Sequence, residues 1–393
     1  MFMSMRLYHL FFLAVAAGSI FVQTVQAQNV QSVADRVAAQ NALFDEQYET
    51  DLRNFPERAT AFGDYRYNDK LADYSLGAIA ERHKTDQSFL ARLNAIPTSG
   101  FSDQDQLSHD LLVRVLQQRI TDYDLKEYEM PINQQGGIHT GLADLPLSVP
   151  FDSVKHYEDY IARLHQIPRV LTQVTEVLRA GMKDKLMPVR FLAEKLPVQC
   201  QGIIDADPFL QPTKKFPASI SAEDQKRLTQ QITDAINNDV IPAYKTFADF
   251  LRTVYAPDGR TTLSVTSLPD GQRRYENDIY ARTTTHMTPN EIHQLGLREI
   301  DRIQAEMLVI AKKEGFADLA SFRDSLKTNP KYIPTSADQI LDDFRHYIAQ
   351  MEPKLPELFT LLPKSPVTVE AIPAFQSAAA THYVTGTPDG KRP

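Results

Sequence analysis

The sequence contains no tryptophan, a single cysteine and only 15 glycines against 24 prolines. A chain with one cysteine cannot form an internal disulfide, which excludes the small exported scaffolds that several disulfides stabilise. The low glycine content disfavours glycine-rich phosphate loops. Strand and helix patterns do not alternate along the sequence, which disfavours a Rossmann fold or a barrel. The chain must therefore be stabilised by a hydrophobic core, and its 393 residues, 42% of them hydrophobic, are enough to build one.

The common catalytic motifs are also absent from the sequence. None of the ten histidines is followed by glutamate and no two lie four residues apart, so the His-Glu-x-x-His pattern of helical zinc hydrolases is missing. His286 and His293 are separated by Pro289 and are not predicted to share a metal ion. Cys200 has no assignable activating base, so we expect a buried or spare thiol. We therefore predict no metal ligands in this chain and assign it no catalytic residues.

The net charge of the chain and the pattern of its N-terminal residues indicate which partners and which cellular compartment to expect. The net charge is −8 without a long basic run, so we expect no nucleic-acid binding. Residues 1–27 have the order of a secretory signal peptide, with Arg6 before an apolar run from Leu10 to Val22 and small residues up to Ala27. That run is shorter than the roughly 20 residues that span a bilayer. We expect an exported, periplasmic protein with no membrane span after cleavage; an uncleaved anchor is the alternative.

The remaining residues, 28–393, predict one helical domain. The best-defined helix lies within residues 283–316, where Thr288 and Glu291 form a capping box and Gly315 marks the end. Comparable apolar periods, separated by proline and glycine, cover most of the chain. We therefore predict an all-α fold, a large body of mainly antiparallel helices.

Two short segments near the C-terminus are exceptions to this helical pattern. Val367–Glu370 and Thr381–Thr385 have the residue types of strands, and a turn follows at residues 387–390. The predicted fold class therefore includes a minor strand element near the C-terminus.

The longest segment without a helical period is 130–151. Its Gly136-Gly137 pair and its prolines predict an irregular loop. Long loops inside a domain are often functional, and His139 of this loop is a candidate for facing a cleft. The alternative is a connector packed over the helices, and the sequence leaves both interpretations open.

Several segments occur in an order known from one bacterial family: Gly63-Asp64 with Tyr67-Asn68-Asp69, Pro131–Gly137, Tyr160–Leu164 with Pro168, Thr283–Gly296, and Tyr383 with Asp389–Pro393. On these segments the sequence resembles the family called domain of unknown function 885. The resemblance covers nearly the whole chain after residue 27 and is most specific at Thr284–Gly296, TTHMTPNEIHQLG. The resemblance implies the helical, cleft-containing fold of a zinc metallopeptidase. Members of the family are often exported. Arg274 departs from the family pattern, in which a second tyrosine often precedes Tyr275.

The resemblance also implies where catalysis would reside. In the family, a His-Glu-x-x-Pro-Gly-His-His segment follows the Asp-Gly-x-Arg-Pro turn, and this sequence ends at that turn. We therefore expect the N-terminal part of a zinc hydrolase, truncated before its zinc ligands. Zinc is expected for a full-length relative, and no cofactor for this chain. His139, Tyr383 and Arg392 would line the cleft, contacting the backbone or oxyanion of a peptide or small amide substrate.

Two classes of function are compatible with these observations. In one, the chain is the inactive N-terminal portion of an exported peptidase-like zinc hydrolase. In the other, it is an exported helical binding or scaffold protein without catalysis. The sequence leaves open whether the chain is an enzyme, and no pattern in it indicates an oligomeric state.

The N-terminal pattern generates a first prediction. The exported protein should begin near Gln28, because the apolar run is too short for a stable membrane span and small residues precede the expected cleavage site. N-terminal sequencing of the exported protein measures this directly. Retention of Met1 would contradict the prediction.

Overall fold

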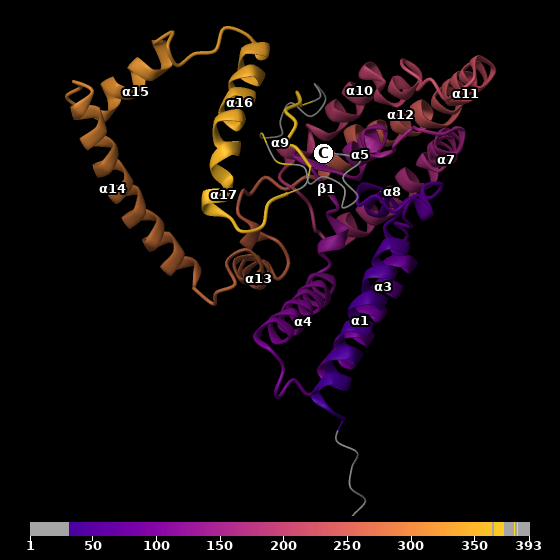
Figure 1. Cartoon of the computed structure of the whole chain (residues 1–393), viewed down its shortest axis with the longest axis horizontal. Coiled ribbons are helices and arrows are strands. Elements are labelled where there is room, and N and C mark those ends of the chain that lie inside the picture. The colour runs from indigo at the N-terminus through magenta and orange to yellow at the C-terminus, as the bar shows by residue number, and fades with distance from the viewer. Residues whose placement is uncertain (1–30, 364, 373–380, 382, 384–393) are drawn as a thin grey trace, which may run out of the picture.

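The computed structural model describes residues 31–363, 365–372, 381 and 383. These residues are mainly helical, with one minor two-stranded sheet, which confirms the predicted fold class (Figure 1). The predicted signal peptide, residues 1–27, lies outside the described residues. None of the helices in the described part combines the length and hydropathy that a membrane-crossing helix requires.

The N-terminal part of the body is built from long helices. They are α1 (Val33–Asn54), α2 (Pro56–Ala61), the 3-10 turn η1 (Tyr65–Tyr67), α3 (Leu76–Asn94) and α4 (Asp103–Asp124). Ser32, Ser75 and Ser102 cap α1, α3 and α4, because each hydroxyl accepts a hydrogen bond from a backbone N–H three residues later. Leu43, Phe89, Leu93 and Leu116 form a small core between these three helices.

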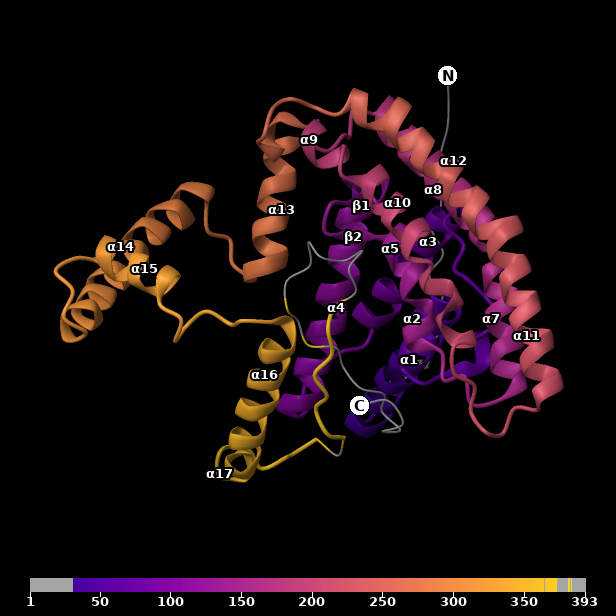
Figure 2. The same ribbon diagram turned by 90° about the horizontal axis from the view of Figure 1, so that it is seen from above.

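The central part of the body contains the main hydrophobic core. Its helices are α7 (Val154–Leu164), α8 (Ile167–Lys183), α9 (Arg190–Ala193), α10 (Leu196–Ala206), α11 (Ala222–Ala235) and α12 (Ile241–Phe250). A π-helical turn, η5 (Ile236–Val240), joins α11 to α12 just before Pro242, whose missing N–H interrupts the normal helical bonding. Figure 2 shows α11 and α12 following one another along one side of the body.

Gly181 lies inside α8, although its position suggests a helix end. The helix continues to Lys183. A Cβ atom on Gly181 would lie 2.5 Å from the carbonyl oxygen of Glu129, in the 3-10 turn η2 (Glu127–Glu129). The glycine therefore permits close approach of α8 to η2.

The loop of residues 130–151 is more regular than the sequence indicates. It contains the antiparallel pair β1 (Ile132–Asn133) and β2 (Gly136–Gly137), followed by α5 (Ile138–Gly141), η3 (Leu142–Asp144) and α6 (Leu145–Ser148). Gly137 has φ 148°, and a Cβ atom there would come within 2.9 Å of the Ile132 backbone, so glycine is needed for this pairing.

The strand element is therefore not where the sequence placed it. Val367–Glu370 is described and carries no strand, and Thr381 and Tyr383 carry none either. The other residues of the predicted segment Thr381–Thr385 lie outside the described residues. Residue types that favour strands do not form one without a hydrogen-bonding partner strand.

Of the remaining helices, the first contacts α4, where Asn277 donates to Asp122 at 2.9 Å, and the next two extend away from the body in both views (Figures 1 and 2). These remaining helices are α13 (Gly271–Thr283), α14 (Pro289–Lys313), α15 (Leu319–Thr328), α16 (Ala337–Met351) and α17 (Leu355–Leu358). The predicted capping box of Thr288 and Glu291 is present at the start of α14. The apolar face of α14 is exposed, however, with Ile300 50% and Ile310 53% accessible. Local capping is therefore correctly predicted here, and burial of the apolar face is not.

Arg163 of α7 links the body to the N-terminal helices. Its guanidinium is fully buried and donates hydrogen bonds to the carbonyl oxygens of Lys70 (2.8 Å), Pro56 (3.1 Å) and Tyr67 (3.2 Å), and to Oγ1 of Thr60 (2.7 Å). Burial lowers the pKa of Arg163 to about 10. The residues that carry the family resemblance at 63–69 and 160–164 thus meet around one buried side chain.

We predict that Arg163→Met destabilises the protein by about 3 kcal/mol, because it leaves several buried acceptors without a donor. The free energy of unfolding from urea titration is the measurement. Arg298→Met is the matched control, since Arg298 is an exposed arginine of α14, and we expect a change below about 0.5 kcal/mol. Equal stabilities of the two variants would contradict the anchoring role of Arg163.

Candidate functional site

A pocket of about 600 Å³ lies among the N-terminal helices and is the candidate functional site. Helices α1, α2, α3 and α4 supply most of its wall, and Val174 and Val177 of α8 close one side. The residues that line the pocket include Thr50, Asp51, Phe55, Glu57, Arg58, Tyr74, Ile79, Arg82, His83, Thr85, Asp86, Phe89, Arg119, Asp122, Tyr123 and Tyr128. The lining therefore combines aromatic and aliphatic surface with paired charges.

Arg119 of α4 binds carboxylates from two other helices. Its guanidinium donates to both carboxylate oxygens of Asp51 in α1, at 3.2 and 2.8 Å, and to Oδ1 of Asp86 in α3, at 3.3 Å. These side chains are largely buried, at 31%, 13% and 17% exposure for Arg119, Asp51 and Asp86. The three helices are thereby held together across the pocket by one charged group.

Burial and charge shift the pKa values of this group in different directions. Burial raises the pKa of Asp86 more than the neighbouring Arg119 lowers it. Burial also opposes the charge on Arg119, but hydrogen bonds to Asp51 and Asp86 outweigh it and raise the pKa of Arg119. The arginine is therefore permanently charged and serves as a structural partner for the two carboxylates.

Aromatic side chains cover another part of the pocket. The rings of His83 and Tyr123 are stacked, with centroids 3.8 Å apart and planes 10° apart, and Tyr128 continues the stack at 5.2 Å from Tyr123. The Arg82 guanidinium lies 5.4 Å from the ring centroid of Phe55. Such surfaces bind flat or cationic groups.

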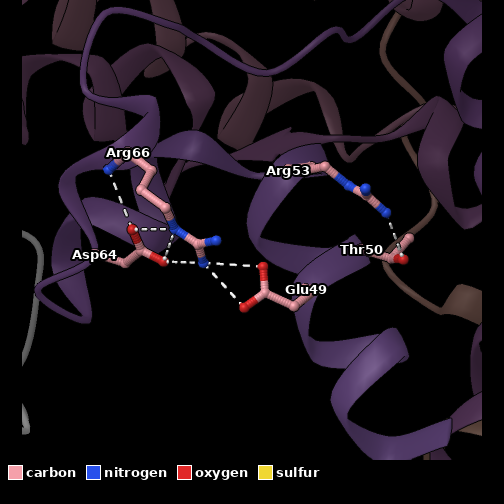
Figure 3. A network of polar contacts seen from close by, with 5 residues as sticks. All are labelled: Glu49, Thr50, Arg53, Asp64 and Arg66. Atoms are coloured by element: carbon pink, nitrogen blue, oxygen red, sulfur yellow. Dashed lines mark hydrogen bonds and ion pairs between the residues drawn. The ribbon is translucent and has the colours of Figure 1, made fainter. Parts of the chain in front are cut away.

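A second group of polar contacts joins α1 to the loop at 63–69 (Figure 3). Arg66 of η1 donates to both carboxylate oxygens of Glu49 in α1, at 3.0 and 2.9 Å, and to the carboxylate of Asp64. Arg53 donates to Oγ1 of the lining residue Thr50 at 3.1 Å. Arg66 therefore fastens the loop at 63–69 to α1, and the polar residues of that loop have a structural role.

Of the three residues predicted to line a cleft, the structure describes His139 and Tyr383. His139 is fully buried between α5 and α10, where its Nε2 lies 3.0 Å from Oε1 of Gln199, and it does not line the pocket. The hydroxyl of Tyr244 donates to its carbonyl oxygen at 2.6 Å. Tyr383 is 71% exposed, and Arg392 lies outside the described residues. The loop around His139 is thus packed onto the helices.

The zinc that the resemblance implies does not fit the described side chains. Among them, no three histidine, cysteine, aspartate or glutamate residues are grouped as metal ligands. His139 is paired with an amide, and burial raises the pKa of the Cys200 thiol to about 12, so it is not a ready thiolate ligand or nucleophile. Cys200 is free and buried, as predicted.

Sequence reasoning missed the pocket. Its charged residues lie in amphipathic helices, where they resemble an ordinary solvated face. Asp86 and Asp51, the two partners of Arg119, lie 33 and 68 residues from it in the sequence. The available signal is that Asp51, Asp86 and Arg119 carry opposite charges and lie in segments that form the helices α1, α3 and α4. That signal does not specify which faces of the three helices turn toward one another.

Comparisons with other proteins identify relatives of the chain. The model of a family described as "Bacterial protein of unknown function (DUF885)" matches residues 56–393. A crystal structure of "the putative lipoprotein from Colwellia psychrerythraea" superposes with a TM-score of 0.80 at 18% sequence identity, covering 92% of this chain and 67% of that chain. At this identity the likeness shows a common fold. Among curated proteins, none matches the chain.

The position of His139 predicts a pH dependence of stability. Burial lowers its pKa below the ordinary value, although the hydrogen bond to Gln199 acts in the other direction. The unfolded chain therefore binds the proton first, and stability is lost as the pH falls below about 6.5. Between pH 7.5 and 5.5, His139→Gln should remove about 1 kcal/mol of the pH-dependent loss in the free energy of unfolding.

Urea titrations at the two pH values measure this difference. His293→Gln is the control, because His293 is exposed on α14 and should leave the pH dependence unchanged. The same pH dependence in both variants would show that His139 does not titrate differently on folding.

Proposed function

The chain belongs to the family of bacterial proteins of unknown function DUF885, and from this membership we propose that it is the helical, N-terminal portion of an exported peptidase-like zinc hydrolase. In this proposal it supplies the body and one wall of a substrate cleft, and the zinc ligands do not come from this chain. The substrate class is a peptide or a small amide.

The sequence supports this assignment of roles. Residues that resemble the family occur along nearly the whole chain, yet no His-Glu-x-x-His pattern is present in the sequence. The described side chains form no group of three metal ligands. A helical zinc hydrolase needs about three protein ligands in fixed geometry, and this requirement supports the proposal that the ligands come from another part of such an enzyme.

We place the protein in an exported compartment, the periplasm, as part of the same proposal. The signal-peptide pattern of residues 1–27 supports export. The structural neighbour is described as a lipoprotein, a class of exported protein, but no cysteine lies near residue 27 that could carry a lipid here. We therefore propose a form that is released after cleavage.

A second candidate is an exported helical binding protein without catalysis. The pocket of about 600 Å³ favours it, because this size suits a small organic ligand and the pocket is complete within the body. The two proposals differ in whether catalytic zinc chemistry is part of the function, since a binding protein needs only the pocket.

Metal analysis and a peptidase assay of the purified protein test the first proposal. We expect less than stoichiometric zinc and no hydrolysis of a mixed peptide library, because the described residues offer no group of three metal ligands. A full-length relative that contains the His-Glu segment is the positive control, and chelation should abolish its activity. Stoichiometric zinc, or chelator-sensitive turnover by this chain, would contradict the assignment.

A further inference from the structure

We propose that the pocket bounded by α1, α3, α4 and α8 binds a small organic cation with an apolar body, such as an arylalkylamine, and that Asp122 of α4 receives its charge. This inference rests on the proposal that the pocket is a binding site. It does not require zinc or hydrolysis.

The first observation is the balance of charge in the pocket. Its lining contains four carboxylates, Asp51, Glu57, Asp86 and Asp122, against three guanidinium groups. The carboxylates of the lining therefore outnumber its guanidinium groups by one. An uncompensated negative charge in a largely apolar pocket attracts a cation.

Two lining carboxylates, Asp122 and Glu57, form no ion pair within the described part of the chain; Glu57 accepts the backbone N–H of Ala72 at 3.0 Å, and Asp122 is the one that adjoins Tyr123 in α4. Asp122 accepts hydrogen bonds from the amide groups of Gln118 (2.7 Å) and Asn277 (2.9 Å), both at Oδ1. Both donors are neutral. The Oδ2 of Asp122 accepts no hydrogen bond from the described residues, whereas Asp51 and Asp86 are already paired with Arg119.

The guanidinium groups argue against an anionic ligand, because each is already in use. Arg119 binds two carboxylates, and Arg82 donates to the carbonyl oxygen of Asp73 at 2.8 Å while lying over Phe55. Arg58 lies 3.8 Å from Asp51 and over the ring of Phe62. An anion would have to compete with these partners.

The rest of the lining suits the body of the ligand. Tyr123 follows Asp122 in α4, and its ring is stacked between His83 and Tyr128. A cation held by Asp122 would therefore lie beside aromatic rings, which also attract positive charge. Phe89, Val174 and Val177 provide apolar surface for an aryl or alkyl group.

Isothermal titration calorimetry with three probes of one shape tests the inference. The probes are 4-phenylbutylamine, 4-phenylbutanol and 4-phenylbutanoate, which are cationic, neutral and anionic at pH 7. We expect the amine to bind at least about tenfold more tightly than the alcohol, because a charge-assisted hydrogen bond is added, and the acid to bind most weakly. Equal affinities, tighter binding of the acid, or no binding of the amine at millimolar concentration would overturn the proposal.

Two variants locate the binding event. Asp122→Asn keeps an oxygen acceptor for Gln118 and Asn277 and removes the charge, so it should reduce the preference for the amine about tenfold or more. Asp124→Asn, an exposed change in the same helix, is the control and should leave the preference intact. Equal effects of the two variants would refute the role of Asp122.

Thr85→Trp adds an independent check of location, because it places a bulky ring on a half-buried lining position of α3. We expect weaker binding of both the amine and the alcohol, with thermal unfolding used to verify that the variant is folded. Unchanged affinities would place the site elsewhere. Amine binding is measured without zinc and without peptide hydrolysis. The amine proposal and the hydrolase proposal can therefore fail independently of each other.

Discussion

The buried guanidinium of Arg163 is the constraint on which the arrangement of the N-terminal helices depends. A buried charge requires hydrogen-bond acceptors, and Nε and Nη2 of Arg163 obtain them from α2 and from the loop up to Lys70, while Nη1 has no partner among the described residues. This ties the loop to α7. Arg66 then ties the same loop to α1 through Glu49. Together the two arginines determine where α1 lies relative to the central body, and α1 forms one wall of the pocket.

The pocket follows from how the three long helices meet. Their shared core is small, consisting of Leu43, Phe89, Leu93 and Leu116 near one end. Further along, the helices are joined by Arg119, Asp51 and Asp86, whose polar groups cannot pack as closely as aliphatic side chains. The space between this charged group and the valines of α8 is the cavity.

The helices after residue 283 illustrate the limit of local information. The start of α14 is formed by Thr288 and Glu291, and Gly315 follows its end with a positive φ of 85°. These contacts involve neighbours in sequence. The burial of an apolar face requires a second element, and in α14 Ala311 is the buried residue while Ile300 and Ile310 are exposed. Helix formation and helix packing are therefore separate properties in this part of the chain.

The sequence by itself determined the helical class, the capped ends of the helices, the buried thiol of Cys200 and the family, because these depend on neighbouring residues or on residue type. Only the tertiary structure decided that His139 is paired with Gln199 rather than exposed in a cleft. It also decided that Asp51, Asp86 and Arg119 converge. A carboxylate on an amphipathic helix looks the same in sequence whether it faces solvent or another helix, and the choice is made by the relative rotation of the helices. That rotation is set by long-range contacts such as those of Arg163, which no local pattern encodes.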